Sequence, residues 1–294
     1  MGRFVTLAAM DETYRHCEAL VRAADKDRYL AALYAPADKR GSLFALYALN
    51  HEIGTTRDRA REPMPGEIRL QWWRDVLGGE RAGEARANPI SAALLETMAR
   101  FGLPVAPLLD LIEAHAFDLY DDPMPTLAAL EAYGRKTEST MFELAARILA
   151  GTDDAALALA AEHAGIAHAI TQILRSVARD ASRRQIYVPA DLLERRGIRV
   201  EHVLAGHTTT ELREASADLR AEARRHFAAF ESLLAQVPVA AMPAFLTVAL
   251  VPRYLSAMGR ADYDPFRSAV EVPQWRRQWA LWRAARRYGR MMRG

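Results

Sequence analysis

The sequence has a single cysteine, Cys17, and this excludes two kinds of scaffold. One thiol cannot form an internal disulfide, and without a Cys-x-x-Cys pair the chain has no zinc ribbon. A lone cysteine suits a reducing compartment, so we expect a cytoplasmic protein. The N-terminal segment has only short apolar runs before Asp11 and Glu12, too little for the hydrophobic region of a secretory signal. We therefore expect this segment to remain uncleaved.

The chain also lacks an excess of charge of one sign. It has 39 Lys+Arg against 37 Asp+Glu, a formal net charge of +2. Nucleic-acid binding depends on a concentrated surplus of basic residues that neutralises the phosphate backbone. We therefore expect no nucleic-acid partner, although a local basic patch is compatible with this balance.

Long hydrophobic runs and the common catalytic motifs are absent as well. A membrane-spanning helix needs about 18 or more apolar residues. The nearest candidate, 237–252, is interrupted by Pro238, Pro243 and Pro252, so we expect no membrane span. The chain has no HExxH, GxSxG, Walker A or GxGxxG string, and His163 and His168 lack the i, i+4 spacing that would let them share a zinc ion. Zinc proteases, serine hydrolases, P-loop NTPases and Rossmann enzymes therefore have no support.

What the sequence has is helical periodicity almost throughout. In the helix that begins after Pro36, Leu43, Leu46, Tyr47 and Asn50 recur at i, i+3, i+4 and i+7. The same periodicity predicts further helices at about 66–78, 89–101, 105–120, 126–150, 154–181, 189–195, 209–236, 243–258 and 273–292. No internal repeat or linker divides the chain, so we predict one all-α domain over residues 1–294.

Two of these helices, 154–174 and 243–258, carry little charge on any face. Helices that are apolar all round are buried centrally or line a cavity. A helical bundle of this size can hold a long apolar ligand between its helices, and a solid core is the alternative.

Two segments, 29–58 and 170–193, resemble the squalene/phytoene synthase family, and the resemblance extends from about residue 17 to residue 266. The residues that match the lead-in to the first motif are Pro36, Arg40, Ala45, Tyr47 and Ala48. The residues that match the second motif are Gln172, Arg175, Asp180, Ile186, Tyr187 and Pro189. The resemblance implies an isoprenoid-synthase-type helical bundle with a central apolar cavity. By family position, the substrate-binding residues would be Tyr29, Arg40, Tyr47, Gln172, Arg175 and Tyr187.

The metal-binding part of that pattern is incomplete. The family holds Mg²⁺ with aspartates from two facing helices, and Mg²⁺ neutralises the diphosphate leaving group. In the first motif Gly54 and Thr55 stand where aspartates are expected, and only Asp58 remains. In the second motif Ser176 and Arg179 replace acidic residues, which leaves Asp180. Asp58 and Asp180 would then either hold one cation together or pair with Arg57, Arg61 or Arg179.

Other changes accompany this loss. Arg175, Arg179 and Arg183 recur at i, i+4 and i+8, with Arg184 beside them, so the second motif is strongly positive. These arginines either grip a phosphate or carboxylate directly or form a solvated face paired with acids, and we favour the second interpretation. The family's Y-C-x-x-x-A-G run, which lines the prenyl cavity, falls at Tyr133 with its cysteine and final glycine replaced.

Within the family, the strings SLFALYALNHEI and SRRQIYVPADLL resemble the branch that includes the mitochondrial complex I assembly factor. The residues that carry this resemblance are Asn50, Ser182, Arg183, Arg184 and Pro189. It implies a synthase-like protein, non-catalytic or catalytically altered, that acts with complex I subunits or assembly intermediates. The alternatives are a Mg²⁺-dependent enzyme that condenses two prenyl diphosphates and a module that binds an apolar lipid.

The C-terminal segment 273–294 is basic and rich in tryptophan. From residue 274 onward it has seven arginines and no acidic residue, with Trp275, Trp279 and Trp282 at i, i+4 and i+7. Such a helix either lies peripherally on an anionic membrane, here the inner face, or docks on the body of the protein by its tryptophan stripe.

Overall fold

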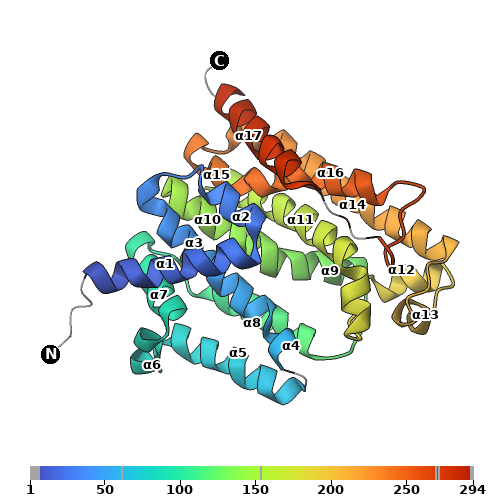
Figure 1. The fold of residues 1–294 in the computed structure, drawn as a ribbon, viewed down its shortest axis with the longest axis horizontal. Coiled ribbons are helices and arrows are strands. Elements are labelled where there is room, and N and C mark those ends of the chain that lie inside the picture. Colours follow the sequence, from blue (N-terminus) through green and yellow to red (C-terminus); the bar gives the residue numbers. More distant parts are fainter. Residues whose placement is uncertain (1–6, 61, 153, 269, 271, 292–294) are drawn as a thin grey trace.

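The protein, described from a computed structural model, is helical throughout the part that the structure describes (Figure 1). That part comprises residues 7–60, 62–152, 154–268, 270 and 272–291, and no strand occurs within it. Arg61, the first six residues and the last three residues of the chain, which include the end of the predicted C-terminal helix, lie outside the described residues. The prediction of an all-α fold is confirmed.

The longer helices enclose the site described below. The α-helices are, in chain order, α1 (Leu7–Ala24), α2 (Lys26–Ala32), α3 (Ala37–Gly54), α4 (Thr56–Arg59), α5 (Pro63–Gly78), α6 (Ala82–Ala87), α7 (Pro89–Phe101), α8 (Ala106–Ala116), α9 (Leu127–Gly134), α10 (Thr140–Ala150), α11 (Ala155–Ser182), α12 (Ala190–Arg195), α13 (Val200–Leu204), α14 (Thr210–Leu233), α15 (Met242–Phe245), α16 (Val251–Met258) and α17 (Gln274–Met291). The 3₁₀ segments are η1 (Phe117–Leu119), η3 (Leu234–Gln236), η4 (Val239–Ala241) and η5 (Leu246–Leu250). The segment η2 (Arg135–Ser139) is a π-helix.

The structure differs from the sequence prediction in two ways: some helices were not predicted, and some predicted helices are divided or change their type. Helices α1, α2, α4, α6 and α13 were not anticipated, and the helix predicted over 243–258 is divided into α15, η5 and α16. Pro243 and Pro252 each lie in the first turn of a new helix, where a missing N–H is tolerated. The helix predicted over 126–150 is continuous from residue 127, but it widens into a π-helix at η2.

One stretch, Val239–Met258, is long and apolar enough to cross a membrane by length and composition alone, with a mean hydropathy of 1.4. Core helices of globular proteins pass the same test, and 61% of the most apolar window is buried in this fold. The stretch also consists of several short helical pieces rather than one helix. It therefore forms part of the core here.

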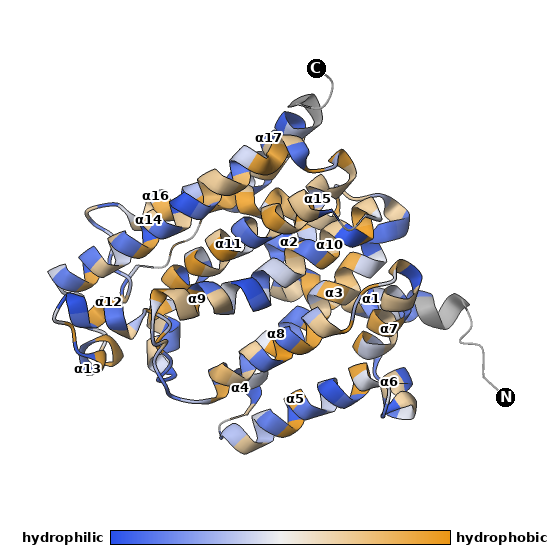
Figure 2. Ribbon diagram, turned by 180° about the vertical axis from the view of Figure 1, so that it is seen from behind, coloured by the Kyte–Doolittle hydropathy of each residue, from blue (hydrophilic) through white to orange (hydrophobic). Residues whose placement is uncertain are grey.

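Helix α11 lies in the middle of the molecule, packed against α9, α10, α14 and η2 (Figure 1). Small side chains on α11 let these neighbours approach closely, and the buried ones are Ala160, Ala161, Ala164, Gly165 and Ala167. Figure 2 shows hydrophobic residues gathered in the central helices, while hydrophilic residues recur along the outer helices α5, α14 and α17. Helix α11 is thereby held on several sides by the surrounding helices.

Gly165 of α11 packs directly against Ser139 of η2. A Cβ atom at Gly165 would overlap the backbone nitrogen, the Cα and the Oγ of Ser139. Backbone atoms cannot move aside as a flexible side chain can. The Ser139 hydroxyl also donates a hydrogen bond to the carbonyl of Glu162, with an Oγ–O distance of 2.9 Å. Glycine at 165 is therefore what allows α11 to pack against η2.

We predict that Gly165→Ala lowers the free energy of unfolding by about 1–3 kcal/mol or more, because it overpacks this crossing. The matched control is Gly83→Ala in α6, where an added Cβ meets nothing within 4 Å. The control should be neutral or stabilising by up to about 1 kcal/mol, since alanine is the better helix former. Urea unfolding followed by circular dichroism measures both, and equal midpoints for the two variants would contradict this account of the crossing.

Candidate functional site

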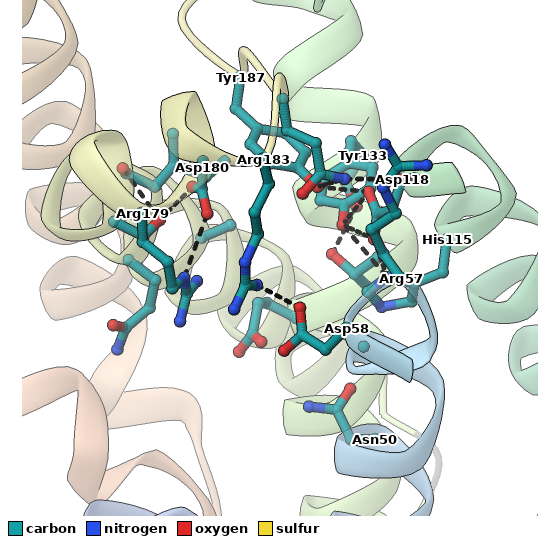
Figure 3. Close-up of a pocket in the computed structure, with 18 residues that line it drawn as sticks. Asn50, Arg57, Asp58, His115, Asp118, Tyr133, Arg179, Asp180, Arg183 and Tyr187 are labelled. Carbon is teal, nitrogen blue, oxygen red and sulfur yellow. Dashed lines mark hydrogen bonds and ion pairs between the residues drawn. The ribbon is translucent and has the colours of Figure 1, made fainter. Parts of the chain in front are cut away.

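A cavity of about 200 Å³ lies between α3, α4, α8, η2 and α11 (Figure 3). Both sequence motifs contribute to its lining, through Gly54 and Asp58 on one side and Ser176 and Asp180 on the other. The sequence predicted an apolar cavity at this place, whereas most of the side chains that line this one are polar or charged. Two buried polar clusters, described below, account for this difference.

Asp58 and Arg183 join the two motifs directly. The Arg183 guanidinium, from the residue that caps α11, forms an ion pair with the Asp58 carboxylate on α4 (Figure 3). Both side chains are about one-third exposed, at 36% and 34%. The cation that faces the carboxylate of the first motif is therefore supplied by the protein itself.

Asp180 lies deeper, with only 5% of its surface exposed. Its carboxylate accepts a hydrogen bond from the Ser176 hydroxyl, and the Nε of Arg179 lies 3.3 Å from its Oδ1. Burial raises the pKa of Asp180, and it outweighs the opposing effects of Ser176 and Arg179. The carboxyl of Asp180 is thus less readily ionised than an ordinary aspartate.

The residues of these two motifs do not fit a Mg²⁺ clamp. Mg²⁺ prefers several oxygen ligands in a near-octahedral arrangement and is usually held by carboxylates. Gly54 offers no ligand, and the Thr55 hydroxyl already donates to the carbonyl of His51, at 2.7 Å. Asp58 is paired with Arg183, so a divalent cation there would meet a positive charge at short range.

A second ion-pair bridge lies beside the first. Arg57 donates to Asp121 (2.7 Å) and to the carbonyl of Leu119 (2.6 Å), and Arg184 donates to the other oxygen of Asp121 (3.0 Å). Arg184 has φ = 63°, and it is the one non-glycine residue with positive φ in the part of the chain that the structure describes. Arg183 and Arg184 follow one another in the chain but pair with different acids, Arg183 with Asp58 and Arg184 with Asp121. Arg179, Arg183 and Arg184 therefore pair with acids, as in the interpretation favoured from the sequence, whereas Arg175 donates to Gln172 and lies over the Tyr254 ring.

Asp118 is the centre of a buried polar cluster at one wall of the cavity (Figure 3). It accepts hydrogen bonds from the hydroxyls of Tyr187 (2.6 Å) and Tyr133 (3.0 Å), and its Oδ2 lies 2.6 Å from the Nδ1 of His115. Burial, and secondly the Asp118 carboxylate, raise the pKa of both tyrosines well above 10, so both remain hydroxyl donors. This cluster, which we call the Asp118 cluster, orients two phenol groups around one carboxylate.

Glu138 is the centre of a second cluster, at the level of the π-helix η2. Its Oε2 lies 2.6 Å from the Nη2 of Arg28 and 2.8 Å from the Nδ1 of His168. The Arg28 guanidinium is 6% exposed and lies over the ring of Tyr47. Burial alone would raise the pKa of Glu138, but the charge of Arg28 and the contact with His168 lower it to about 2. We call Arg28, Glu138 and His168 the Glu138 cluster.

The central residue of this cluster, Glu138, lies within the run that lines the prenyl cavity in the family. Glu138 occupies the alanine position of the Y-C-x-x-x-A-G pattern that begins at Tyr133. Sequence reasoning missed Arg28, Glu138 and Asp118, and it considered His168 only as a possible zinc ligand, which the spacing did not support. The partners are 110 residues apart in the pair Arg28–Glu138, so no local pattern marks them.

Two of the six predicted substrate-binding residues, Gln172 and Tyr187, line the cavity directly. Arg175 lies behind Gln172: it donates to the Gln172 Oε1 (2.7 Å) and covers the ring of Tyr254 at 3.8 Å. Tyr47 is buried under Arg28, and burial raises the pKa of Tyr47 to about 12. Of the two, Arg175 contacts a residue that lines the cavity, Gln172.

The other two predicted residues lie away from the cavity. Tyr29 stacks on Phe44, with ring centroids 5.6 Å apart. Arg40 donates to the carbonyls of Ala35 and Leu33, each at 2.9 Å, and so holds the turn before α3. The substrate-binding role of all six residues stays a prediction.

Within the described part of the chain, one group of three side chains has the spacing of a metal site: Glu131, Glu222 and His226. Arg225 already bridges this group, since its Nη2 forms ion pairs with both Glu131 and Glu222. The group lies between α9 and α14, away from the cavity lined by the two motifs.

Comparisons with known proteins agree with the resemblance seen in the sequence. The family model for squalene/phytoene synthase matches residues 21–283. The chain is 28% identical over 260 residues to the rat (Rattus norvegicus) "NADH dehydrogenase (ubiquinone) complex I, assembly factor 6", covering 88% of this chain and 78% of that protein. It is 27% identical over 225 residues to a phytoene synthase of Arthrospira platensis, covering 72% of each.

A solved structure shows the same fold. A dehydrosqualene synthase in complex with a ligand superposes with a TM-score of 0.82 at 20% identity, over 96% of this chain and 99% of that one. The prediction of an isoprenoid-synthase-type bundle is thereby confirmed.

We predict that Glu138→Gln lowers the free energy of unfolding by about 3–5 kcal/mol, because it leaves the Arg28 guanidinium buried without a counter-charge. Glu162→Gln is the matched control: Glu162 also pairs with an arginine, Arg135, at 2.9 Å, but both side chains are about one-third exposed or more. Glu162→Gln should lower the free energy of unfolding by only about 0–1 kcal/mol. Urea unfolding at pH 7 measures both, and equal costs would contradict a buried charge at Glu138.

The pH dependence supplies a second check on Glu138. Its pKa is lowered in the folded state, so its contribution is fully present above the unfolded value of 4.5 and is lost as the pH falls toward about 2. The stability difference between the native chain and Glu138→Gln should therefore shrink across this interval. A difference that stays constant from pH 7 to pH 2.5 would contradict the assignment.

Proposed function

The chain belongs to the squalene/phytoene synthase family, and we propose that it is a single-domain member, over residues 1–294, that no longer carries out head-to-head prenyl transfer and acts in the assembly of respiratory complex I. Its partners would be complex I subunits or assembly intermediates. The proposal joins two inferences, one about lost chemistry and one about the process that the protein serves, and each has its own support.

The ion pair between Arg183 and Asp58 carries the first inference. Prenyl transfer begins with loss of a diphosphate, whose several negative charges must be neutralised as the bond breaks. In this chain the carboxylate that would attract the metal for this purpose is bound by a guanidinium of the same protein. The second carboxyl, Asp180, is buried with a raised pKa. Neither motif retains a free, ionised pair of carboxylates.

The Glu138 cluster also supports the loss of prenyl transfer, because a prenyl substrate would have to bind beside it. A long prenyl chain gains its binding energy from apolar walls, whereas a charged side chain cannot be stripped of its partners without a large cost. Glu138 stands where the family pattern has an alanine. Its Oε2 lies 2.6 Å from the Nη2 of Arg28 and 2.8 Å from the Nδ1 of His168. The site is thus better matched to a short polar ligand or to no ligand.

The relatives support the second inference. Complex I assembly factors from rat and human are 28% and 29% identical to this chain over 260 and 259 residues, in each case over 88% of its length. The branch resemblance at Asn50 and at the Ser182-Arg183-Arg184 run is consistent with this. In this chain Arg183 and Arg184 are the residues that close the second motif onto α4 and the loop after η1.

We predict no turnover when the purified protein is incubated with farnesyl or geranylgeranyl diphosphate, Mg²⁺ and NADPH, with products analysed by mass spectrometry. A variant that restores the family's acids, Gly54→Asp/Thr55→Asp/Ser176→Asp/Arg179→Glu, should bind Mg²⁺ at least about tenfold more tightly by calorimetry, since it adds four carboxylates. The same variant with Asp58→Asn/Asp180→Asn added is its control and should lose that gain. Turnover by the unmodified chain would refute the loss of catalysis and would favour a prenyltransferase.

In cells that lack this gene, we predict a fall in assembled complex I and in NADH:ubiquinone oxidoreductase activity, both restored by the native chain. Asp58→Asn/Asp180→Asn should restore them equally at matched expression, because a role without metal chemistry does not use the two carboxylates. Complex I at its normal level in the deletion would overturn the assembly role. If only the double variant failed to restore complex I, and circular dichroism showed that it folds normally, the function would depend on the carboxylates of Asp58 and Asp180.

A further inference from the structure

Helix α17 has two apolar faces, and only one of them is used by the fold. The inner face packs on η5, α2 and α15 through Ala280, Leu281, Ala284 and Tyr288, all at most 7% exposed. Ion pairs fix the helix at two further points: Arg277 with Asp27 at 3.0 Å, and Arg287 with Glu231 at 2.9 Å. The helix is therefore docked on the body of the protein.

The outer face carries the three tryptophans. Trp275, Trp279 and Trp282 are 65%, 45% and 44% exposed, which is exceptional for such large apolar side chains. At about 100° per residue their i, i+4, i+7 spacing places them in one row, on the side of the helix opposite Leu281 and Ala284. Docking by the tryptophan stripe, one of the two arrangements expected from the sequence, is thus not what the structure shows.

Arginines surround this row. Arg276 lies over the Trp275 ring at 5.1 Å, Arg283 over the Trp279 ring at 5.3 Å, and Arg286 over the Trp282 ring at 4.5 Å. Among the described residues, none of these three guanidiniums forms an ion pair with a carboxylate, in contrast to Arg277 and Arg287 on the same helix. The outer face is therefore apolar, positively charged and without an acidic residue.

We propose that this outer face, formed by Trp275, Trp279, Trp282, Arg276, Arg283 and Arg286, binds an anionic lipid surface. Tryptophan rings favour the headgroup level of a bilayer, where their apolar body and polar N–H are both satisfied. Guanidiniums bind lipid phosphates in bidentate fashion, and the row lies along the helix so that all three rings meet a flat surface together. The inner face remains on the protein, so the contact is peripheral and requires no unfolding.

The position of α17 fits this use. In Figures 1 and 2 the helix forms one edge of the molecule, and α5 forms the opposite edge. A surface bound along α17 therefore meets little else of the chain and leaves the cavity beside α4 and α11 open to solvent or to a partner.

The test is sedimentation of the full chain with vesicles of phosphatidylcholine and phosphatidylglycerol (3:1) and with vesicles of phosphatidylcholine alone. We expect binding to the anionic vesicles, at least tenfold weaker binding to the neutral ones, and release by salt. Trp275→Ser/Trp279→Ser/Trp282→Ser should reduce binding at least tenfold. Arg276→Gln/Arg283→Gln/Arg286→Gln should do so as well, because each arginine near an anionic surface contributes about fivefold in affinity.

Two matched controls separate this face from general effects of polarity and charge. Met64→Ser/Ile68→Ser removes apolar side chains that are 73% and 66% exposed, on α5 at the opposite edge. Arg15→Gln/Arg195→Gln/Arg260→Gln removes three charges from exposed side chains elsewhere. Both should bind like the native chain, and circular dichroism checks that all variants fold.

Three results would overturn the proposal. The first is equal binding by the native chain and both α17 variants. The second is equal loss of binding in the controls, which would make the attraction nonspecific. The third is a dimer in lipid-free analytical ultracentrifugation that the tryptophan variant converts to a monomer, because the outer face would then belong to a second copy of the chain.

Discussion

The ion pair between Arg183 and Asp58 is the contact on which the arrangement of the cavity depends. It ties the end of α11, the central helix, to α4, and so fixes the distance between the two motif segments. Without the Arg183 guanidinium, the Asp58 carboxylate would have no counter-charge from the second motif. With it, the charges of Asp58 and Arg183 balance one another within the protein.

The same principle, internal neutralisation of charge, explains the deeper part of the cavity. The Glu138 carboxylate is acceptable in the interior only because Arg28 and His168 contact it. Asp118 is similarly held by two tyrosine hydroxyls and a histidine. Each cluster is satisfied by residues from separate helices, so each also fixes how those helices pack. The polar groups that line the cavity are thus also part of what holds the bundle together.

How much of this was predictable depends on the range of the interactions. The helical periodicity of 89–101 and 154–181 gives α7 and α11 almost to the residue, because an amphipathic or alanine-rich helix is a local property of sequence. The order of the motif residues also predicts that Asp58 and Asp180 approach one cavity, as the structure shows. The π-helix at η2 and the breaks at Pro243 and Pro252 depend on packing, and periodicity alone does not reveal them.

The pairing of charges was the harder step, since it is set by tertiary distance. The sequence offered Arg57, Arg61 and Arg179 as partners for the aspartates. In the structure Arg179 does contact Asp180, whereas Arg57 binds Asp121 and Asp58 pairs with Arg183 instead. A replacement such as Ser176 or Arg179 in a metal motif therefore shows that a ligand is missing, but only the folded chain shows what stands in its place. Here the Arg183 guanidinium pairs with the remaining aspartate of the first motif, and this ion pair connects α4 to the end of α11.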